Sequence, residues 1–412
     1  MFFRKRKNSS RVRLHLTLAG WAVFGACFLV GVVAVNSGMA LLIVLLGTLL
    51  GSIHISAVLS RRMISGVAVR REAPARCRQN ESVGFGYRLT SLRGAGSCLA
   101  LHVRESATEG LHVPPAACGH LAARGGFLLR SEVLPLHRGR MELRGVRLGT
   151  PFPFGLLWAR RMFDQPDSLV VWPARGTLAR GLLGRGDAHS SSINPSSRSG
   201  GADEFVGLRD YRPGDSIRWI HLRRSAGRHM PVVREMSKPR PRTLWVILDT
   251  LLDASTGRAW AARERAIRLA ATLIEDGLAA GFRVGAAWAQ ADDVRVIPPA
   301  ERPGQLNVLL DALAEVDENR ARTLGETTAR LGPRRLCQAD VVLVSPAEAD
   351  EAADTLDGES IARLRRESRD LTVLAGLRIA DAFQDAPLPP EALLPPAPKV
   401  HAAPAGSKAR MS

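Results

Sequence analysis

The sequence predicts a two-helix transmembrane hairpin, then a β-sandwich-like domain, then a doubly wound α/β domain. Two long uncharged apolar runs stand near the N-terminus, period-two apolar patterns follow, and buried-strand runs then alternate with amphipathic helices. The predicted units are a basic cytoplasmic N-terminus (1–15), the hairpin (16–60), the β-rich domain (61–175), a flexible linker (176–202), a polar signature segment (203–242), the α/β domain (243–380) and a disordered Ala/Pro-rich tail (381–412).

The apolar hairpin is predicted from two runs, Leu16–Val35 and Gly38–Ser60, each long enough to cross about 30 Å of hydrocarbon. Basic residues flank both outer ends, and none stands at the tip between the runs. The positive-inside rule then places both termini in the cytoplasm. A cleaved signal peptide is the alternative, but the first run is long for one and a second apolar run follows at once.

Charge is distributed unevenly along the 412 residues. The chain has 57 Lys and Arg against 39 Asp and Glu, a net charge of +18, yet residues 243–412 carry 20 basic and 25 acidic side chains, a net charge of −5. We interpret the N-terminal basic excess as attraction to anionic inner-leaflet lipids rather than to nucleic acid. The five cysteines are scattered without a C-x-x-C pair, which indicates a reducing compartment and no zinc site.

The β-rich domain is predicted from short alternating runs. Ser82–Thr90 places Val, Phe, Tyr and Leu on one face, and further strands are expected around Leu101, around Met141 and over Leu169–Trp172. The segment Pro151–Leu156 is predicted to be a rigid turn that places aromatic side chains at an edge.

The α/β domain is predicted from continuous apolar runs separated by helical patterns. The expected strands are Leu244–Leu248, Phe282–Ala289, Val341–Val344 and Leu371–Ala375. Helices are expected up to about Ala280, over Pro303–Val316 and over Ile361–Ser368. Strands that alternate with helices in this way favour a parallel sheet covered on both faces.

No recognisable catalytic motif is present. The sequence lacks a phosphate-binding G-x-x-x-x-G-K-[ST] loop, a zinc-binding H-E-x-x-H, a G-x-S-x-G nucleophile and a dinucleotide-binding G-x-G-x-x-G that opens a helix. We therefore predict no catalytic residues, no cofactor and no enzymatic activity. The densest polar stretch, 201–235, mixes arginines and carboxylates with apolar anchors. We interpret it first as a packed inter-domain clasp, with a protein-docking surface and an anion or nucleic-acid groove as alternatives.

Within that stretch a short pattern resembles the signature of the domain of unknown function 58 family. The matching residues are Phe205, Gly207, Leu208, Arg209, Tyr211, Gly214, Asp215, Arg218, Ser225 and Ala226. Pro153–Leu156 and Val170–Pro173 also resemble that family, whereas Leu222 and Arg223 depart from its usual Trp and Lys. The resemblance implies a bacterial inner-membrane protein with a von Willebrand factor A-like (Rossmann-type) α/β domain. It also implies association with MoxR-type AAA+ ATPases.

Von Willebrand factor A-like domains often bind Mg²⁺ through a D-x-S-x-S motif after the first strand, because hard cations prefer oxygen ligands. The matching residues here are Asp249–Asp253, in which Leu251 replaces the first serine and Asp253 the second. Since leucine cannot ligate a metal, we predict no metal and expect Asp249 to cap the following loop.

The leading hypothesis is a non-catalytic inner-membrane scaffold or adaptor that binds protein partners, plausibly a MoxR-type AAA+ ATPase, through its cytoplasmic A-like domain or the signature segment. Two alternatives stay open: a cell-envelope enzyme with an unrecognised site, and a basic nucleic-acid-binding module.

Overall fold

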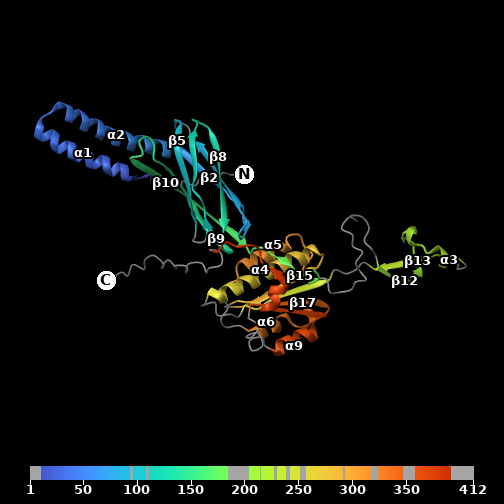
Figure 1. Ribbon diagram of the computed structural model, residues 1–412. Helices are drawn as coiled ribbons and strands as arrows, with labels where there is room; N and C mark the ends of the chain where they lie inside the picture. Colours follow the sequence, from blue (N-terminus) through green and yellow to red (C-terminus); the bar gives the residue numbers. More distant parts are fainter. Residues whose placement is uncertain are drawn as a thin grey trace, which may run out of the picture.

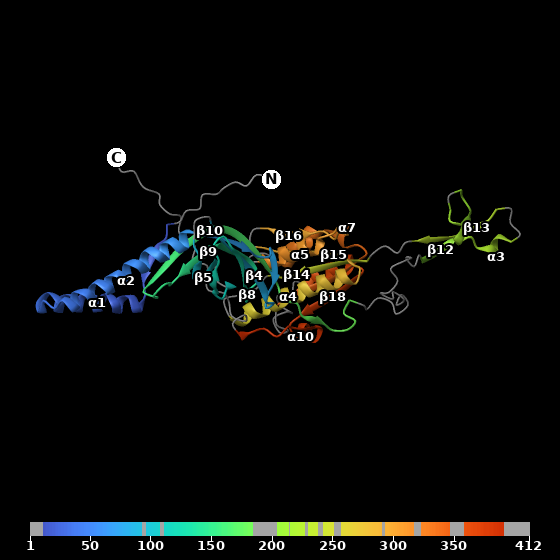
Figure 2. The same ribbon diagram turned by 90° about the horizontal axis from the view of Figure 1, so that it is seen from above.

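The computed structural model describes residues 11–92, 96–107, 111–183, 204–213, 215–226, 230–237, 242–250, 257–290, 293–316, 323–346 and 358–390. Figure 1 shows a pair of long helices, then a strand-rich domain and an α/β domain, with a separate hairpin at the far end. The same order of parts is visible from above in Figure 2.

The helical pair consists of α1 (Leu18–Ser37) and α2 (Ala40–Ser65). Both are long and apolar enough to cross a membrane, and 20 residues of helix span about 30 Å. Gly38 has a φ of 63° at the end of α1, a left-handed conformation that glycine adopts at little cost. The second helix continues five residues beyond the predicted end at Ser60 and leads directly into the β-rich domain.

The start of the chain differs from the prediction. Residues 13–16, expected in the basic tail and the first apolar run, form strand β1 (Arg13–Leu16), which pairs antiparallel with the start of β10. Thr17 then caps α1, since its hydroxyl accepts a hydrogen bond from the Gly20 N–H at 3.0 Å. The sequence could not show this, because the strand that pairs with β1 lies more than 140 residues downstream.

The strand-rich domain has two sheets over one core. The strands of the first sheet, in spatial order, are β1, β10 (Leu157–Trp172), β9 (Gly139–Thr150), β5 (Cys98–Ala107) and β7 (Ala116–Leu121), with β3 (Arg76–Arg78) beside β10. Those of the second are β2 (Val67–Glu72), β4 (Val83–Ser91), β8 (Gly126–Pro135) and β6 (Leu111–His112). Alternate residues such as Phe85, Leu101 and Leu148 are fully buried between them.

The α/β domain has a five-stranded sheet. Its spatial order is β16 (Val294–Ile297), β15 (Arg283–Ala289), β14 (Thr243–Leu248), β17 (Ala339–Ser345) and β18 (Asp370–Ala375). All neighbours are parallel except the edge strand β16. The four predicted strands are present, whereas β16 was missed because four residues give too short a pattern.

Both faces of this sheet are covered, which explains the continuous apolar run of β14. Leu244, Val246 and Leu248 pack on one side against α4 (Gly257–Ala279) and α5 (Gln305–Ala314). Trp245 and Ile247 face the other side. There they meet the helices α6 (Leu324–Leu331), α7 (Pro333–Leu336) and α9 (Gly358–Glu367). Successive residues of a strand point to opposite faces, so every position is apolar.

Parts of the predicted linker and tail are structured. Strand β11 (Thr177–Leu178) pairs with β19 (Phe383–Gln384), which follows α10 (Leu377–Ala382). Phe383 is only 1% exposed in the core under α4, and Arg268 donates to the Asp385 carboxylate at 2.8 Å. The predictions of a flexible 176–202 and a disordered 381–412 are therefore wrong at these positions. Residues 184–203 and 391–412 lie outside the described residues.

Arginines of the strand-rich domain meet carboxylates of α4, α5 and the residue after α5. The pairs are Arg76–Asp311, Arg78–Glu275, Arg138–Glu264, Arg140–Glu315 and Arg175–Asp276, with N–O distances between 2.6 and 2.9 Å. We call these ten residues the inter-domain clasp. They join the basic N-terminal portion to the acidic C-terminal portion, so part of the basic excess that we ascribed to lipids is used within the molecule.

Candidate functional site

The signature segment folds as a small hairpin. Strands β12 (Glu204–Asp210) and β13 (Val232–Ser237) pair antiparallel, with a register shift between Phe205 and Gly207. Between them lie a 3-10 turn, η1 (Ile217–Trp219), and the single-turn helix α3 (Leu222–Ser225). In both views the hairpin stands away from the two domains (Figures 1 and 2).

This position overturns our first interpretation of the segment. A clasp between the domains does exist, but it is built by the arginines and carboxylates described above, and the described residues of the hairpin, 204–237, take no part in those pairs. Arginines are frequent both in the strand-rich domain and in residues 203–242. The sequence could not show which of the two regions forms the clasp, since charge alone does not say which carboxylates each arginine reaches.

A bidentate ion pair holds the loop of the hairpin. Both terminal nitrogens of Arg209 lie 2.7 Å from the two carboxylate oxygens of Asp215, and the Arg212 N–H also donates to this carboxylate at 2.9 Å. The Arg209 guanidinium, helped by that N–H, lowers the pKa of Asp215 to about 2. These two signature residues therefore shape the turn itself.

Ser225 closes the other side of the loop. Its hydroxyl donates to the His221 carbonyl at 3.0 Å and accepts from the Val232 N–H at 2.9 Å. A backbone hydrogen bond joins the same residues, because the His221 N–H donates to the Val232 carbonyl at 2.8 Å. Val232 and Val233 are buried, and they supply the small apolar centre on which this turn rests.

The remaining signature residues divide between backbone and surface positions. Gly207 and Leu208 lie in β12, Tyr211 follows it half-buried, and Arg218 and Ala226 are exposed. The side chain of Phe205 and the whole of Gly214 lie outside the described residues.

Several exposed residues of the hairpin are large and apolar, and sequence reasoning missed most of them. Ile217 is 76% exposed, Leu222 79% and Met230 55%, whereas Trp219 is 37% exposed. These four residues form what we call the apolar tip. The segment has no helical or strand periodicity from which the exposure of its apolar residues could be predicted. In the sequence, only the departure from the family pattern at Leu222 distinguished one of them. Exposed apolar residues gathered on one small element indicate an interaction surface.

The position equivalent to the metal motif is closed by a neighbouring strand. Asp249 is 8% exposed, and the Ser345 hydroxyl donates to its carboxylate at 2.9 Å. Thr250 donates to the Ala289 carbonyl at 2.6 Å. Within the described ranges no group of three or more His, Cys, Asp or Glu could hold a metal ion. Residues 251–256, which include Leu251 and Asp253, lie outside the described residues.

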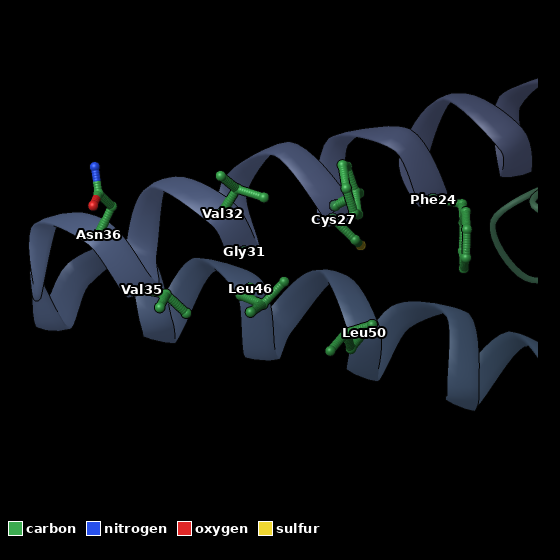
Figure 3. A pocket seen from close by; sticks show the side chains of 9 residues that line it. Phe24, Cys27, Gly31, Val32, Val35, Asn36, Leu46 and Leu50 are labelled. Carbon is green, nitrogen blue, oxygen red and sulfur yellow. The ribbon is translucent and has the colours of Figure 1, made fainter.

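A groove of about 890 Å³ runs between α1 and α2. Figure 3 shows Leu46 and Leu50 of α2 facing α1 across it, with Phe24 at one end and Asn36 turned away at the other. Its lining is apolar except for Asn36 and the Cys27 thiol. Such a lining can hold hydrocarbon but offers little to orient a polar substrate.

The described elements thus define a class of protein: two apolar helices that suggest a membrane anchor, a strand-rich domain, and an α/β domain with a projecting hairpin. A family model described as "Protein of unknown function DUF58" matches residues 207–392. This match over residues 207–392 supports the family that the resemblance predicted.

No curated protein matched the chain. Solved structures of the CARDB domain of the PF1109 protein from Pyrococcus furiosus are similar to a part of it. The crystal structure shares 12% identity over 26% of this chain and 86% of that chain, with a TM-score of 0.19. The solution structure shares 9% identity over 26% and 94%, with a TM-score of 0.17. Similarities this weak carry no argument about fold or function.

Proposed function

We propose that this chain is a non-catalytic adaptor of the bacterial inner membrane, with both termini in the cytoplasm, and that its signature hairpin binds a protein partner. The observation that carries the proposal is the exposure of Ile217 and Leu222 at 76% and 79% on an element that stands clear of both domains. Leaving two large aliphatic side chains mostly exposed forgoes at most about 1.5–3 kcal/mol of burial for each, which a partner would recover.

The partner that we propose is a MoxR-type AAA+ ATPase, on the strength of the family resemblance. The exposed Arg212 and Arg218 beside the apolar tip favour a partner surface that is apolar in its centre and acidic around it.

The α/β domain would be von Willebrand factor A-like. Its support is the strand order, in which the first strand is central, the second and third lie on one side, and the fourth and fifth on the other. The third strand, β16, lies antiparallel at the edge of the sheet, and this also supports the proposed von Willebrand factor A-like fold.

The test is crosslinking in intact cells from positions 205–228, followed by identification of the attached protein. Ile217→Asp together with Leu222→Asp should abolish co-purification of the ATPase in detergent. Val308→Asp is the matched control, because Val308 is 47% exposed on α5 of the α/β domain. A purification that retains the intact hairpin but brings down no ATPase would contradict the partner. If the variant with Ile217→Asp and Leu222→Asp co-purified as much ATPase as the unmodified chain, the apolar tip would not be the binding site.

A further inference from the structure

The loop between β9 and β10, residues 151–156, lies against the first turn of α1. The Thr17 hydroxyl donates to the Gly155 carbonyl at 2.6 Å, and the Thr17 N–H donates to the Leu156 carbonyl at 3.0 Å. A Cβ atom on Gly20 would lie 2.1 Å from that Leu156 oxygen. The loop backbone is therefore in direct contact with α1, and only glycine permits this approach.

This contact fixes the depth of the loop relative to the helix. If α1 spans the hydrocarbon, as the proposed membrane anchoring requires, its 20 residues use about 30 Å and its first turn lies at the boundary with the headgroups. The 151–156 loop then lies at the same boundary. Phe154 is at this loop and is 56% exposed.

Strands β1 and β10 continue away from this boundary with a gradient of polarity. In their register, His15 is opposite Trp158, and Arg13 is opposite Arg160. Strand β10 begins at Leu157 and rises about 3.3 Å per residue. Trp158 is therefore about 3.3 Å and Arg160 about 10 Å further along the strand. The order is thus Phe154, then Trp158, then the arginines, which matches hydrocarbon edge, interfacial aromatic belt and phosphate layer.

Trp158 is held in place on the outer face of this sheet. Its ring lies over Gly149, where a Cβ atom would be only 3.2 Å away. The His102 ring contacts it edge-on at 5.1 Å, and the Arg160 guanidinium lies 5.5 Å from its centre. The tryptophan is half-buried, so its ring is held by these contacts while part of it stays accessible.

Arg13 and Arg160 are directly opposite each other in the register of β1 and β10. Both are exposed, and among the described residues neither forms an ion pair with a carboxylate. Like charges directly opposite on paired strands repel each other. An anion between the two guanidinium groups would remove the repulsion, and a phosphate accepts two arginines well.

We propose that these residues form a lipid-binding surface: Phe154 inserts at the boundary of headgroups and acyl chains, and Arg13 with Arg160 binds the phosphate of an anionic phospholipid. The strand-rich domain then contacts the bilayer surface directly, in addition to the two helices that span it. This contact orients the α/β domain and its hairpin toward the cytoplasm.

The first experiment uses the full chain with benzoylphenylalanine as a photocrosslinker, reconstituted into vesicles of phosphatidylcholine and phosphatidylglycerol. Phe154→benzoylphenylalanine should yield phospholipid adducts by mass spectrometry. The same replacement of Leu134 should stay at background. Leu134 is 39% exposed, and the β2–β4–β8 register places it at the end of β8 away from α2.

A third position separates the two ways to fail. Phe28 is 74% exposed on α1 and must give adducts if that helix is in the bilayer. Adducts at Phe28 with only background at Phe154 would overturn the lipid-binding surface and leave the anchor intact. No adducts at Phe28 would overturn the membrane anchoring on which both proposals rest.

The second experiment tests the arginines. In the Phe154→benzoylphenylalanine chain, Arg13→Glu with Arg160→Glu should lower the preference for phosphatidylglycerol over phosphatidylcholine about tenfold, which corresponds to ~1.4 kcal/mol. The control, Arg334→Glu with Arg335→Glu, changes the net charge equally at two exposed positions on α7. An equal loss of preference in the control would show a general charge effect and refute the phosphate site.

Discussion

Arg138 connects the two domains through a buried ion pair, and its removal should be the most costly single change in the inter-domain clasp. The side chain is 6% exposed, and that of Glu264 is 5% exposed. One terminal nitrogen lies 2.9 Å from the Glu264 carboxylate, and both terminal nitrogens donate to the Val316 carbonyl at 2.9 and 3.1 Å. Arg138→Ala leaves that carboxylate buried without its closest cation.

Breaking a buried pair by removing one partner costs about 3–5 kcal/mol, because the remaining charge is uncompensated. An exposed pair contributes only about 0–1 kcal/mol. The chain supplies the exposed control in Arg88–Glu72, whose N–O distance is 2.7 Å but whose side chains are 54% and 42% exposed. Arg88→Ala should therefore change the free energy of unfolding by a fraction of the amount that Arg138→Ala does.

The assay is urea unfolding of the full chain in detergent, followed by tryptophan fluorescence, since Trp172 and Trp260 lie at the interface between the domains. The double variant Arg138→Ala/Glu264→Ala should lose less than the sum of the single losses, because it no longer buries a lone charge. The reasoning is refuted if Arg138→Ala and Arg88→Ala unfold at the same urea concentration, or if the two single losses simply add.

Three further predictions concern other parts of the molecule. Gly20→Ala should displace the 151–156 loop and lower the melting temperature, whereas Gly25→Ala, with open space around it, should not; equal melting temperatures would contradict the close approach. Phe383→Ala should cost about 3–5 kcal/mol in urea unfolding, as for a core aromatic, and a loss below about 1 kcal/mol would mean that the tail is not packed. The pKa of Asp215 is lowered from 3.8 to about 2, so its ion pair with Arg209 is fully present above pH 3.8 and is lost as the pH falls through about 2. The protection of the Arg212 amide from hydrogen exchange, relative to the intrinsic rate at each pH, should fall over that window, and protection that is already lost near neutral pH would contradict this pairing.

Much of the α/β domain could be predicted because its signals are local. The run Leu244–Leu248 can be buried on both faces only in a central strand, and that is where β14 lies. Gly281, expected just after the first helix, has a φ of 83°, and α4 ends at Ala279. Short elements such as β16 and β11 were missed, because two to four residues contain too little periodicity to distinguish a strand from a loop.

The candidate site was found in the sequence only in part. The Arg209–Asp215 pair is close in the chain, so a turn that joins the two could be inferred from Pro213 and the charges. The exposure of Ile217 and Leu222 could not, since an apolar residue outside a periodic element is as often buried as exposed.

The sequence by itself determined the two apolar helices, the alternation of strands and helices, and the resemblance to the family whose model matches residues 207–392, because each depends on residues near one another in the chain. Only the tertiary structure decided which arginines join the domains, that residues 13–16 pair with a strand from the middle of the chain, and that Phe383 returns to the core. Those contacts connect residues as far as 235 positions apart, and no local pattern specifies which of many equivalent arginines, strands or aromatics will meet.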